Sequence, residues 1–301
     1  MTVLDQMVAE GLVDENVPLG PMTTYKSGGP ARFLMEAESV ADLQRLAGSG
    51  IAAGLPILVI GRGSNLVVSD AGFPGLVVHL GARFGTVTVD GITVTGGASA
   101  PLAQVARASV NAGITGLEFF VGIPGSVGGA IRQNAGCFGQ ETRDRLTTCT
   151  IFDLGTAQVT TRGPDRLDMS YRHSNLEANQ VVLEATFAGE VGDVTAGLAE
   201  LRRITRWRRD NQPGGTLNAG SVFKNPPGQT AGEIIDSIGL KGMRVGDVSV
   251  STKHANFFVA GPRATSRDIR GLVEAVKDRV REATGTILEP EIQFVGFDDE
   301  H

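Results

Sequence analysis

The pattern of apolar and polar residues predicts a protein of mixed α and β structure. The clearest alternation, Thr-Val-Thr-Val-Asp-Gly-Ile-Thr-Val-Thr over residues 86–95, predicts a hairpin that turns at Asp90 and Gly91. Shorter runs rich in Val, Ile and Leu predict further strands, and Pro290 confines the last of them to an edge or a bend. The predicted strands cover residues 55–60, 66–68, 76–80, 147–152, 157–161, 181–187, 255–259 and 287–295.

Helices are predicted where apolar residues recur every three or four positions between capping signals. Thr230 with Glu233 and Thr265 with Asp268 have the spacing of capping boxes, in which two polar side chains satisfy the first free N–H groups of a helix. The predicted helices cover residues 39–48, 99–111, 196–209, 230–239 and 265–285. No internal repeat is evident, and residues 210–215, Asp-Asn-Gln-Pro-Gly-Gly, form the preferred domain boundary.

Charge and composition narrow the class of protein. Five arginines in the helix at 196–209 invite a nucleic-acid interpretation, but the solvated face of an amphipathic helix is favoured roughly four to one. A net charge of −6 points the same way, so we expect no nucleic-acid partner. The first residues lack a basic region followed by an apolar core, and no apolar run approaches ~18 residues, so neither secretion nor a membrane span is expected. The two cysteines fit a reducing cytoplasm. No histidines or cysteines have the spacing of metal ligands, so no metal is expected.

Glycine is the compositional outlier, with 41 in 301 residues. Residues 116–136 hold more glycine than a strand or helix needs, which predicts a segment that brings bare main chain against an anionic ligand. A second run, Gly-Arg-Gly-Ser-Asn over 61–65, follows the apolar strand at 57–60. Two such turns suggest a dinucleotide, although neither the Rossmann nor the P-loop pattern is present.

Three further places could carry chemistry. If residues 218–226 are extended, Ser221, Phe223 and Asn225 share one face, which suggests a proton donor with an amide beside it; a surface turn is about as probable from the residues alone. Arg172 could grip a carboxylate or phosphate with two parallel bonds, although an exposed ion-pairing arginine is the commoner explanation. Glu289 and Glu291 could equally be solvated edge charges.

The order of the motifs resembles the UDP-N-acetylenolpyruvoylglucosamine reductases of bacterial cell-wall synthesis, over nearly the whole chain. Each motif is weak alone, but their joint order and spacing are specific. They are Thr-Thr-Tyr-Lys-Ser-Gly-Gly-Pro-Ala at 23–31, Gly-Arg-Gly-Ser-Asn at 61–65, Gly-Ile-Pro-Gly-Ser-Val-Gly-Gly at 122–129, Asn-Ala-Gly at 134–136, Tyr-Arg-His-Ser at 171–174, Ala-Gly-Ser-Val-Phe-Lys-Asn-Pro at 219–226 and Leu-Glu-Pro-Glu at 288–291.

The resemblance implies an α+β fold in three parts. Residues 1–82 and 83–212 would form a two-part FAD-binding region of the vanillyl-alcohol-oxidase or PCMH-like type. Residues 213–301 would form an α+β substrate domain, whose last strand, about 286–296, returns toward the flavin. The implied FAD contacts are Gly61, Arg62, Gly63, Ser64, Asn65, Gly122, Ile123, Pro124, Gly125, Ser126, Gly128, Gly129, Asn134 and Gly136.

The reaction implied by the resemblance is reduction of an enolpyruvyl ether on a UDP-sugar to a lactyl ether, with hydride taken from NADPH through FAD. Arg172 would hold the substrate carboxylate and stabilise the enolate, Ser221 would protonate its α carbon, and Glu291 would assist from the other side. Lys224 and Asn225 would contact the substrate. The chain resembles the shorter subgroup, which lacks a tyrosine-bearing insertion, and a monomer is expected.

Two other functions remain open from the sequence. An FAD oxidase of the same fold would need neither Arg172 nor Ser221 at the flavin. A nucleotide-sugar binding protein would have kept the scaffold without turnover, and the colour of the purified protein would separate it from both enzymes.

Overall fold

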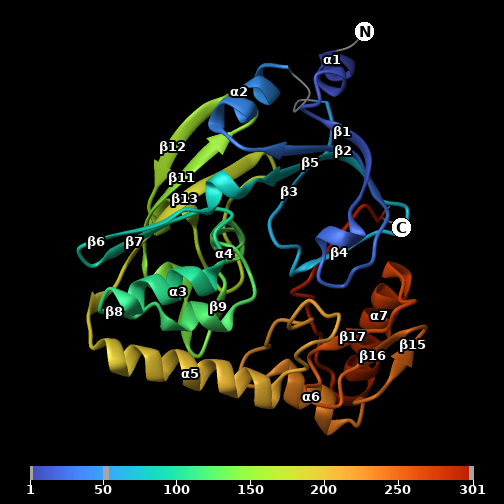
Figure 1. Cartoon of the computed structure of the whole chain (residues 1–301). Helices are drawn as coiled ribbons and strands as arrows, with labels where there is room; N and C mark the ends of the chain where they lie inside the picture. The colour runs from blue at the N-terminus through green and yellow to red at the C-terminus, as the bar shows by residue number, and fades with distance from the viewer. Residues whose placement is uncertain (1–2, 50–53, 298–301) are drawn as a thin grey trace. The chain divides into compact units, whose positions relative to one another are not determined.

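The computed structural model describes residues 3–49 and 54–297, and the chain divides into two compact units (Figure 1). The first unit comprises Met1–Val17, Arg32–Arg62 and Pro74–Arg206. The second comprises Pro18–Ala31, Gly63–Phe73 and Trp207–His301. The mixture of strands and helices agrees with the predicted α+β class.

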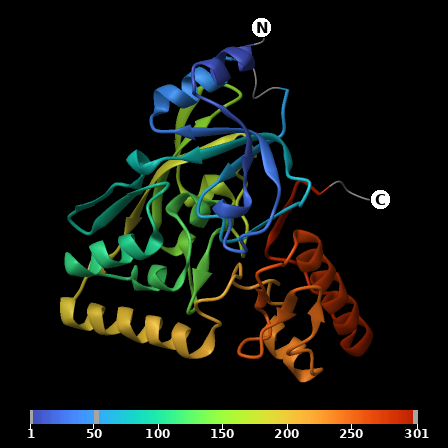
Figure 2. The same ribbon diagram turned by 45° about the vertical axis from the view of Figure 1, so that its right-hand side comes forward.

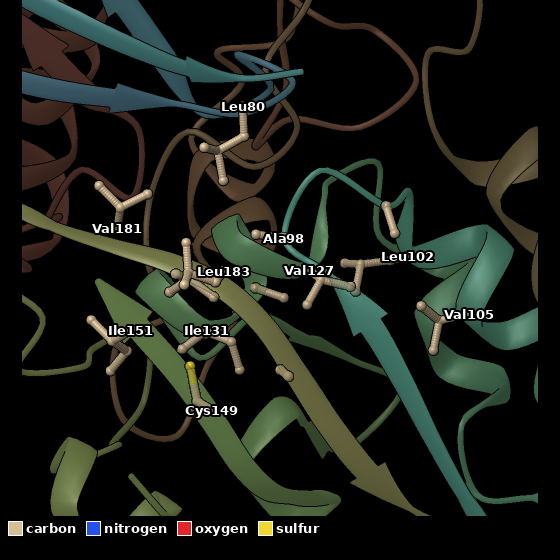
Figure 3. Close-up of a cluster of buried hydrophobic side chains, with 14 of the residues drawn as sticks. Leu80, Ala98, Leu102, Val105, Val127, Ile131, Cys149, Ile151, Val181 and Leu183 are labelled. Atoms are coloured by element: carbon tan, nitrogen blue, oxygen red, sulfur yellow. The ribbon is translucent and has the colours of Figure 1, made fainter. Parts of the chain in front are cut away.

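The core of the first unit is an antiparallel five-stranded sheet in the order β12-β11-β13-β7-β6. Helices α3 and α4 pack on it, and α5 packs on α3, where Gly197 lets the helices approach: a Cβ there would lie 2.8 Å from Val110. Figure 3 shows Ile131 of α4 beside Cys149 and Leu183 of the sheet. The bounds are α3 Leu102–Asn111, α4 Val127–Gln133, α5 Val194–Asn211, β6 Val87–Asp90, β7 Thr93–Gly97, β11 Leu146–Asp153, β12 Gln158–Arg162 and β13 Gln180–Ala188.

A second sheet, in the order β1-β2-β5-β3, belongs mainly to the same unit. Its β3 and β5 are parallel, and short antiparallel pairs join β8 to β14 and β9 to β10. The bounds are α1 Val3–Ala9, α2 Val40–Gly48, β1 Asp14–Pro18, β2 Pro30–Ala37, β3 Ile57–Ile60, β5 Phe73–Leu80, β8 Ile114–Thr115, β9 Gly136–Cys137, β10 Gln140–Glu141 and β14 Glu190–Val191. The 3₁₀ turns are η1 Gly20–Met22, η3 Ala82–Gly85, η4 Glu118–Gly122, η5 Thr142–Asp144 and η6 Pro164–Leu167.

The second unit has its own core around a three-stranded antiparallel sheet, β15-β16-β17, against which α7 packs (Figure 2, α7 in red). The phenol of Tyr25 donates to the Phe258 carbonyl at 3.3 Å and ties the N-terminal part of this unit to the sheet. Strand β18 pairs in parallel with β4, which follows the 61–65 turn. The bounds are α6 Ala231–Ser237, α7 Ser266–Thr284, β4 Leu66–Val68, β15 Arg244–Val245, β16 Val248–Val250, β17 Phe258–Ala260 and β18 Gln293–Val295.

The capping signals and the hairpin are confirmed. Capping boxes open α2, α6 and α7, and β6 and β7 pair around the predicted turn. In α5 the arginines are exposed as expected except for Arg208, which is half-buried. Leu198 and Trp207 are also 37% and 40% exposed, so the buried face of α5 is narrower than predicted. No helix in the described ranges has the length and apolar character needed to cross a bilayer.

The glycine-rich run corrects one prediction, because it is not simply loop. Residues 127–133 form α4, and Gly128 within it faces Ala98, whose Cβ would lie 3.2 Å from an added Cβ. This glycine therefore allows close packing of the helix on its own unit, a use that glycine content alone did not separate from ligand binding.

Two predicted strands are shorter than expected. The strand at 255–259 is found at Phe258–Ala260, because residues 254–257 make hydrogen bonds that support a neighbouring segment. The strand at 287–295 is reduced to Gln293–Val295, and Pro290 forms only an isolated bridge to Phe223.

Candidate functional site

Gly61 of one predicted glycine turn lies beside Ser126 of the other, and both residues belong to the first unit. A Cβ added to Gly61 would lie 2.6 Å from the Ser126 hydroxyl oxygen, so Gly61 leaves room for that side chain. Ser126 is 3% exposed and precedes α4, but its hydroxyl caps no N–H there, and no hydrogen bond from it to the described residues is found. Gly61 of the first motif and Ser126 of the second thus lie against each other.

Other glycines of these motifs serve packing within the protein. Gly63 has φ +57°, and a Cβ there would lie 2.2 Å from the Met22 carbonyl. Gly122 faces the Cys137 sulfur in the same way, at 2.7 Å. Gly129 differs: it is exposed, and an added Cβ would meet only Ser126, at an ordinary 3.7 Å. Glycine destabilises a helix by about 1 kcal/mol relative to alanine. Packing within the protein therefore does not explain why position 129 is a glycine.

Arg172 lies at the tip of a tight turn in the first unit. Ser170 and His173 exchange main-chain hydrogen bonds of 3.2 and 3.1 Å across it, and Arg172 adopts φ +55°, an unusual conformation for a residue with a side chain. Its guanidinium donates to the Gly136 carbonyl at 3.0 Å and lies 4.9 Å from the Tyr171 ring centroid. The turn therefore presents a half-buried cation that is already partly oriented.

Asn134 ends α4 in the left-handed conformation and is fully buried. Its amide nitrogen donates to the Ser170 carbonyl and to Glu141 Oε2, both at 2.9 Å, and its oxygen accepts from Arg143 N–H, also at 2.9 Å. Both N–H donors of this side chain are therefore used within the first unit, and its oxygen accepts one hydrogen bond there. A cofactor contact at Asn134 stays a prediction.

Ser221 lies in the second unit, in an irregular extended segment. The next residue, Val222, donates its N–H to the Asn256 carbonyl at 2.9 Å and accepts at its own carbonyl from the Glu291 N–H at 2.7 Å. The structure thus places Ser221 and Glu291 on adjacent, hydrogen-bonded segments. Val222 and Phe223 are both buried while Ser221 is half-buried and Asn225 is exposed, and the predicted common face of Ser221, Phe223 and Asn225 stays a prediction.

The two predicted substrate contacts, Lys224 and Asn225, follow Ser221 in the chain. Lys224 forms an ion pair with Glu289 at 2.5 Å. Asn225 accepts from the Ala231 N–H at 3.0 Å, at the start of α6. The structure therefore gives both predicted substrate contacts a partner within the second unit.

Two residues of this site were not predicted in these roles. Asn256 is 3% exposed and binds both main-chain groups of Phe223, at 2.9 and 2.8 Å. Asn65 donates its amide to the Glu291 carbonyl at 3.0 Å, while its own carbonyl accepts from Gln293 N–H at 2.9 Å. The available signal for Asn256 was its place between two apolar residues, Ala255 and Phe257, because a buried amide needs hydrogen-bond partners.

His254 lies next to this part of the second unit. Its Nδ1 accepts from the Asn256 N–H at 3.3 Å, and its ring contacts Phe257 edge to face at 4.7 Å. Burial, and secondly the charge of Lys241, lower the pKa of His254 below its usual value. The described residues contain no group of three His, Cys, Asp or Glu side chains able to hold a metal ion.

Comparisons with known proteins agree over most of the chain. Residues 31–161 match the model of an FAD binding domain, and residues 212–295 match the UDP-N-acetylenolpyruvoylglucosamine reductase C-terminal domain. Curated enzymes named UDP-N-acetylenolpyruvoylglucosamine reductase are 44% identical in Erythrobacter litoralis and 41% identical in Azorhizobium caulinodans; each alignment covers 95% of this chain, and 88% and 92% of the relative.

A solved structure gives the same picture. The crystal structure of UDP-N-acetylenolpyruvylglucosamine reductase from Thermus caldophilus superposes with a TM-score of 0.81 at 36% identity. The match covers 93% of this chain and 98% of that one. The similarity therefore extends over both compact units.

Proposed function

Since this chain belongs to the UDP-N-acetylenolpyruvoylglucosamine reductase family, and so is an FAD-dependent oxidoreductase of peptidoglycan precursor synthesis, we propose that Arg172, Ser221 and Glu291 carry out its chemistry. The enzyme reduces the enolpyruvyl ether of UDP-N-acetylglucosamine-enolpyruvate to UDP-N-acetylmuramate, with NADPH as the hydride donor. The family, the fold class, FAD and the reaction predicted from the sequence are thereby confirmed, and the reductase is favoured over the oxidase and the binding protein.

Several narrower features belong to the proposal. We place the enzyme in the cytoplasm because Cys137 and Cys149 are free thiols, which suits a reducing compartment. We propose a monomer that acts on a small UDP-sugar and binds no nucleic acid. The division into domains at 1–82, 83–212 and 213–301 stays a prediction.

The residues of the first unit fit an FAD site. Gly61 and Gly129 lie beside the Ser126 hydroxyl, and an alanine at position 129 would meet no tight contact within the protein. Main-chain N–H groups and a hydroxyl are the groups that bind a diphosphate without adding charge. These three residues would therefore hold FAD most directly, among the predicted contacts. FAD, when bound, passes the hydride of NADPH to the enolpyruvyl double bond.

Each proposed catalytic residue has a distinct role in the reduction of the enolpyruvyl ether. Hydride arrival at the β carbon leaves negative charge on the α carbon and its carboxylate, and the Arg172 guanidinium would stabilise this enolate. The Ser221 hydroxyl would donate its proton to the α carbon. Glu291 would bind the anionic species through its own proton or a shared one. Lys224 and Asn225 would contact the UDP-sugar.

The observation that carries this assignment is the 2.7 Å hydrogen bond from the Glu291 N–H to the Val222 carbonyl. It joins the segment of the proton donor to the segment of the acid, although 69 positions, 291 minus 222, separate them in the sequence. The main-chain hydrogen bond would position Ser221 and Glu291 near each other before the substrate binds.

Replacing Ser221 with alanine tests the proposal. NADPH should bleach the bound flavin of the variant as in the wild type, but anaerobic reoxidation by the enolpyruvyl UDP-sugar should slow by ~10²-fold or more, because a positioned acid is lost. Ser249→Ala, the same change on the half-buried outer position of β16, should reoxidise at the wild-type rate. Equal rates in the Ser221 variant and the wild type would reject the assignment.

A further inference from the structure

The turn that carries Arg172 adopts a conformation that its own residues do not favour. Arg172 has φ +55°, where a residue with a Cβ is strained, and it is not a glycine or asparagine. Such a conformation persists only where surrounding contacts fix it. The contacts that fix this turn should therefore matter for the reaction.

Asn134 supplies the most direct of these contacts. Its amide nitrogen donates to the Ser170 carbonyl at 2.9 Å, and Ser170 is the first residue of the turn. Asn134 itself has φ +42° as the C-cap residue that follows α4, and it is fully buried. One fixed side chain thus links the end of the helix after the glycine motif to the turn of Arg172.

A second pair of side chains completes the network. Glu141 Oε2 accepts from the Asn134 amide and from Arg143 Nε, each at 2.9 Å. Arg143 Nη1 then donates to the Met169 carbonyl at 3.1 Å, one residue before Ser170. Two consecutive carbonyls that lead into the turn are therefore held by side chains whose own positions are fixed by Glu141. The Arg172 guanidinium also donates to the carbonyl of Gly136, two residues after Asn134.

We propose that Asn134 is a positioning residue for the reduction: through the Ser170 carbonyl it sets the place of the Arg172 guanidinium against the developing enolate. This inference rests on the proposed role of Arg172. It also gives the asparagine of the 134–136 motif a function other than cofactor binding. A displacement of ~1 Å at a charged catalytic group can cost roughly 10²-fold in rate, which is the size of effect to look for.

Two substitutions separate the contribution of the amide from that of the backbone. Asn134→Gly keeps the left-handed conformation without strain but deletes all three side-chain bonds. Asn134→Asp keeps an acceptor for the Arg143 N–H but cannot donate to Ser170 when ionised. Both variants should keep bound FAD and the wild-type rate of bleaching by NADPH, and in both, reoxidation by the enolpyruvyl UDP-sugar should slow by roughly 10²-fold.

Asn16→Gly is the matched control. Asn16 also has a positive φ, +53°, but it is exposed in β1, and the same substitution there should change neither half of the reaction. A readout independent of activity is amide hydrogen exchange in the holoenzyme. In Asn134→Gly, the His173 N–H, which is bonded to the Ser170 carbonyl, should exchange roughly tenfold faster, while amides of β13 keep the wild-type rate.

The outcomes divide cleanly. Wild-type reoxidation in either Asn134 variant, or unchanged exchange at His173, would overturn the positioning role. Loss of bound flavin in both variants would also overturn it, because Asn134 would then be needed for stability or for the cofactor. Arg172→Ala distinguishes the two levels of the argument: if it reoxidises at the wild-type rate, the proposed role of Arg172 fails, whereas a slow Arg172→Ala with fast Asn134 variants rejects only the present inference.

Discussion

The carbonyls that lead into the turn of Arg172 are held by side chains, whereas Val222, next to Ser221, is held by main-chain pairing. At the turn, the amide of Asn134 donates to the Ser170 carbonyl, and the Arg143 guanidinium donates to the Met169 carbonyl. At Ser221, the next residue, Val222, has both main-chain groups bonded to neighbouring chain. The two halves of the proposed chemistry are thus positioned by different means.

The difference follows from the shapes of the two segments. A tight turn directs its main-chain groups outward and has few main-chain partners, so side chains must satisfy the carbonyls that lead into it. An extended segment can be paired on both edges by other extended chain. Substitutions near Arg172 should therefore displace a catalytic group, whereas those near Ser221 should first lower the stability of the second unit.

Asn256 offers the largest test of this contrast. Its side-chain amide accepts from the N–H of the buried Phe223 and donates to the Phe223 carbonyl, as a peptide group of a neighbouring strand would. Asn256→Ala leaves two buried groups without partners and should lower the free energy of unfolding by ~2–4 kcal/mol. Urea denaturation followed by circular dichroism measures this change.

Asn218→Ala is the control for Asn256→Ala. The Asn218 amide donates to nearby loop atoms at Pro213 and Thr216 and accepts from the Gly220 N–H, at a position that is only half-buried, and its loss should cost less than ~1 kcal/mol. If the Asn256 variant is no less stable than this control, main-chain pairing alone holds the Ser221 segment, and the role given to the Asn256 amide is wrong.

Local sequence signals predicted the elements of the fold better than their pairing. The capping boxes at Ser39, Thr230 and Thr265 depend on residues three positions apart, so they are visible in the sequence. The parallel pair of β4 and β18 joins Leu66–Val68 to Gln293–Val295, and no local pattern specifies that partner. The helical part of the glycine run was missed because Gly128 is required by its contact with Ala98, which only the folded sheet creates.

The candidate site was predictable in its residues but not in its supports. Motif order identified Arg172, Ser221 and Glu291 as candidates through the family resemblance. Asn134 was assigned to the cofactor because it stands in a glycine motif, yet its amide is used inside the protein. The sequence pattern predicted a strand over residues 255–259, which includes Asn256, and gave no sign of its side-chain hydrogen bonds. A buried amide reveals its partners only once distant segments are brought together.

Asn65 should give a smaller effect than Asn256. Its amide makes a hydrogen bond to the Glu291 carbonyl, but its own main-chain bond to Gln293 survives substitution. Asn65→Ala should therefore lower the free energy of unfolding of the flavin-free protein by ~1 kcal/mol. Ser64→Ala, the neighbouring change, should leave that free energy unchanged. A loss at Asn65 as large as that at Asn256 would show that a side chain dominates here too, against the contrast drawn above.

The smallest expected effect is a pH dependence confined to the second unit. Burial, with the charge of Lys241, lowers the pKa of His254, and its Nδ1 can accept from Asn256 only while that nitrogen is unprotonated. In the unfolded chain this histidine has the usual pKa of 6.5, so the unfolded chain binds the proton more readily than the folded one. The free energy of unfolding should therefore fall as the pH drops below about 6.5 and recover above it. Urea denaturation between about pH 5 and 7.5 measures this dependence, and His254→Gln should reduce it. His173→Gln, at an exposed position in the Arg172 turn, is the control and should keep the wild-type dependence. Parallel curves for the wild type and His254→Gln would mean that the paired segment does not depend on the neutral ring.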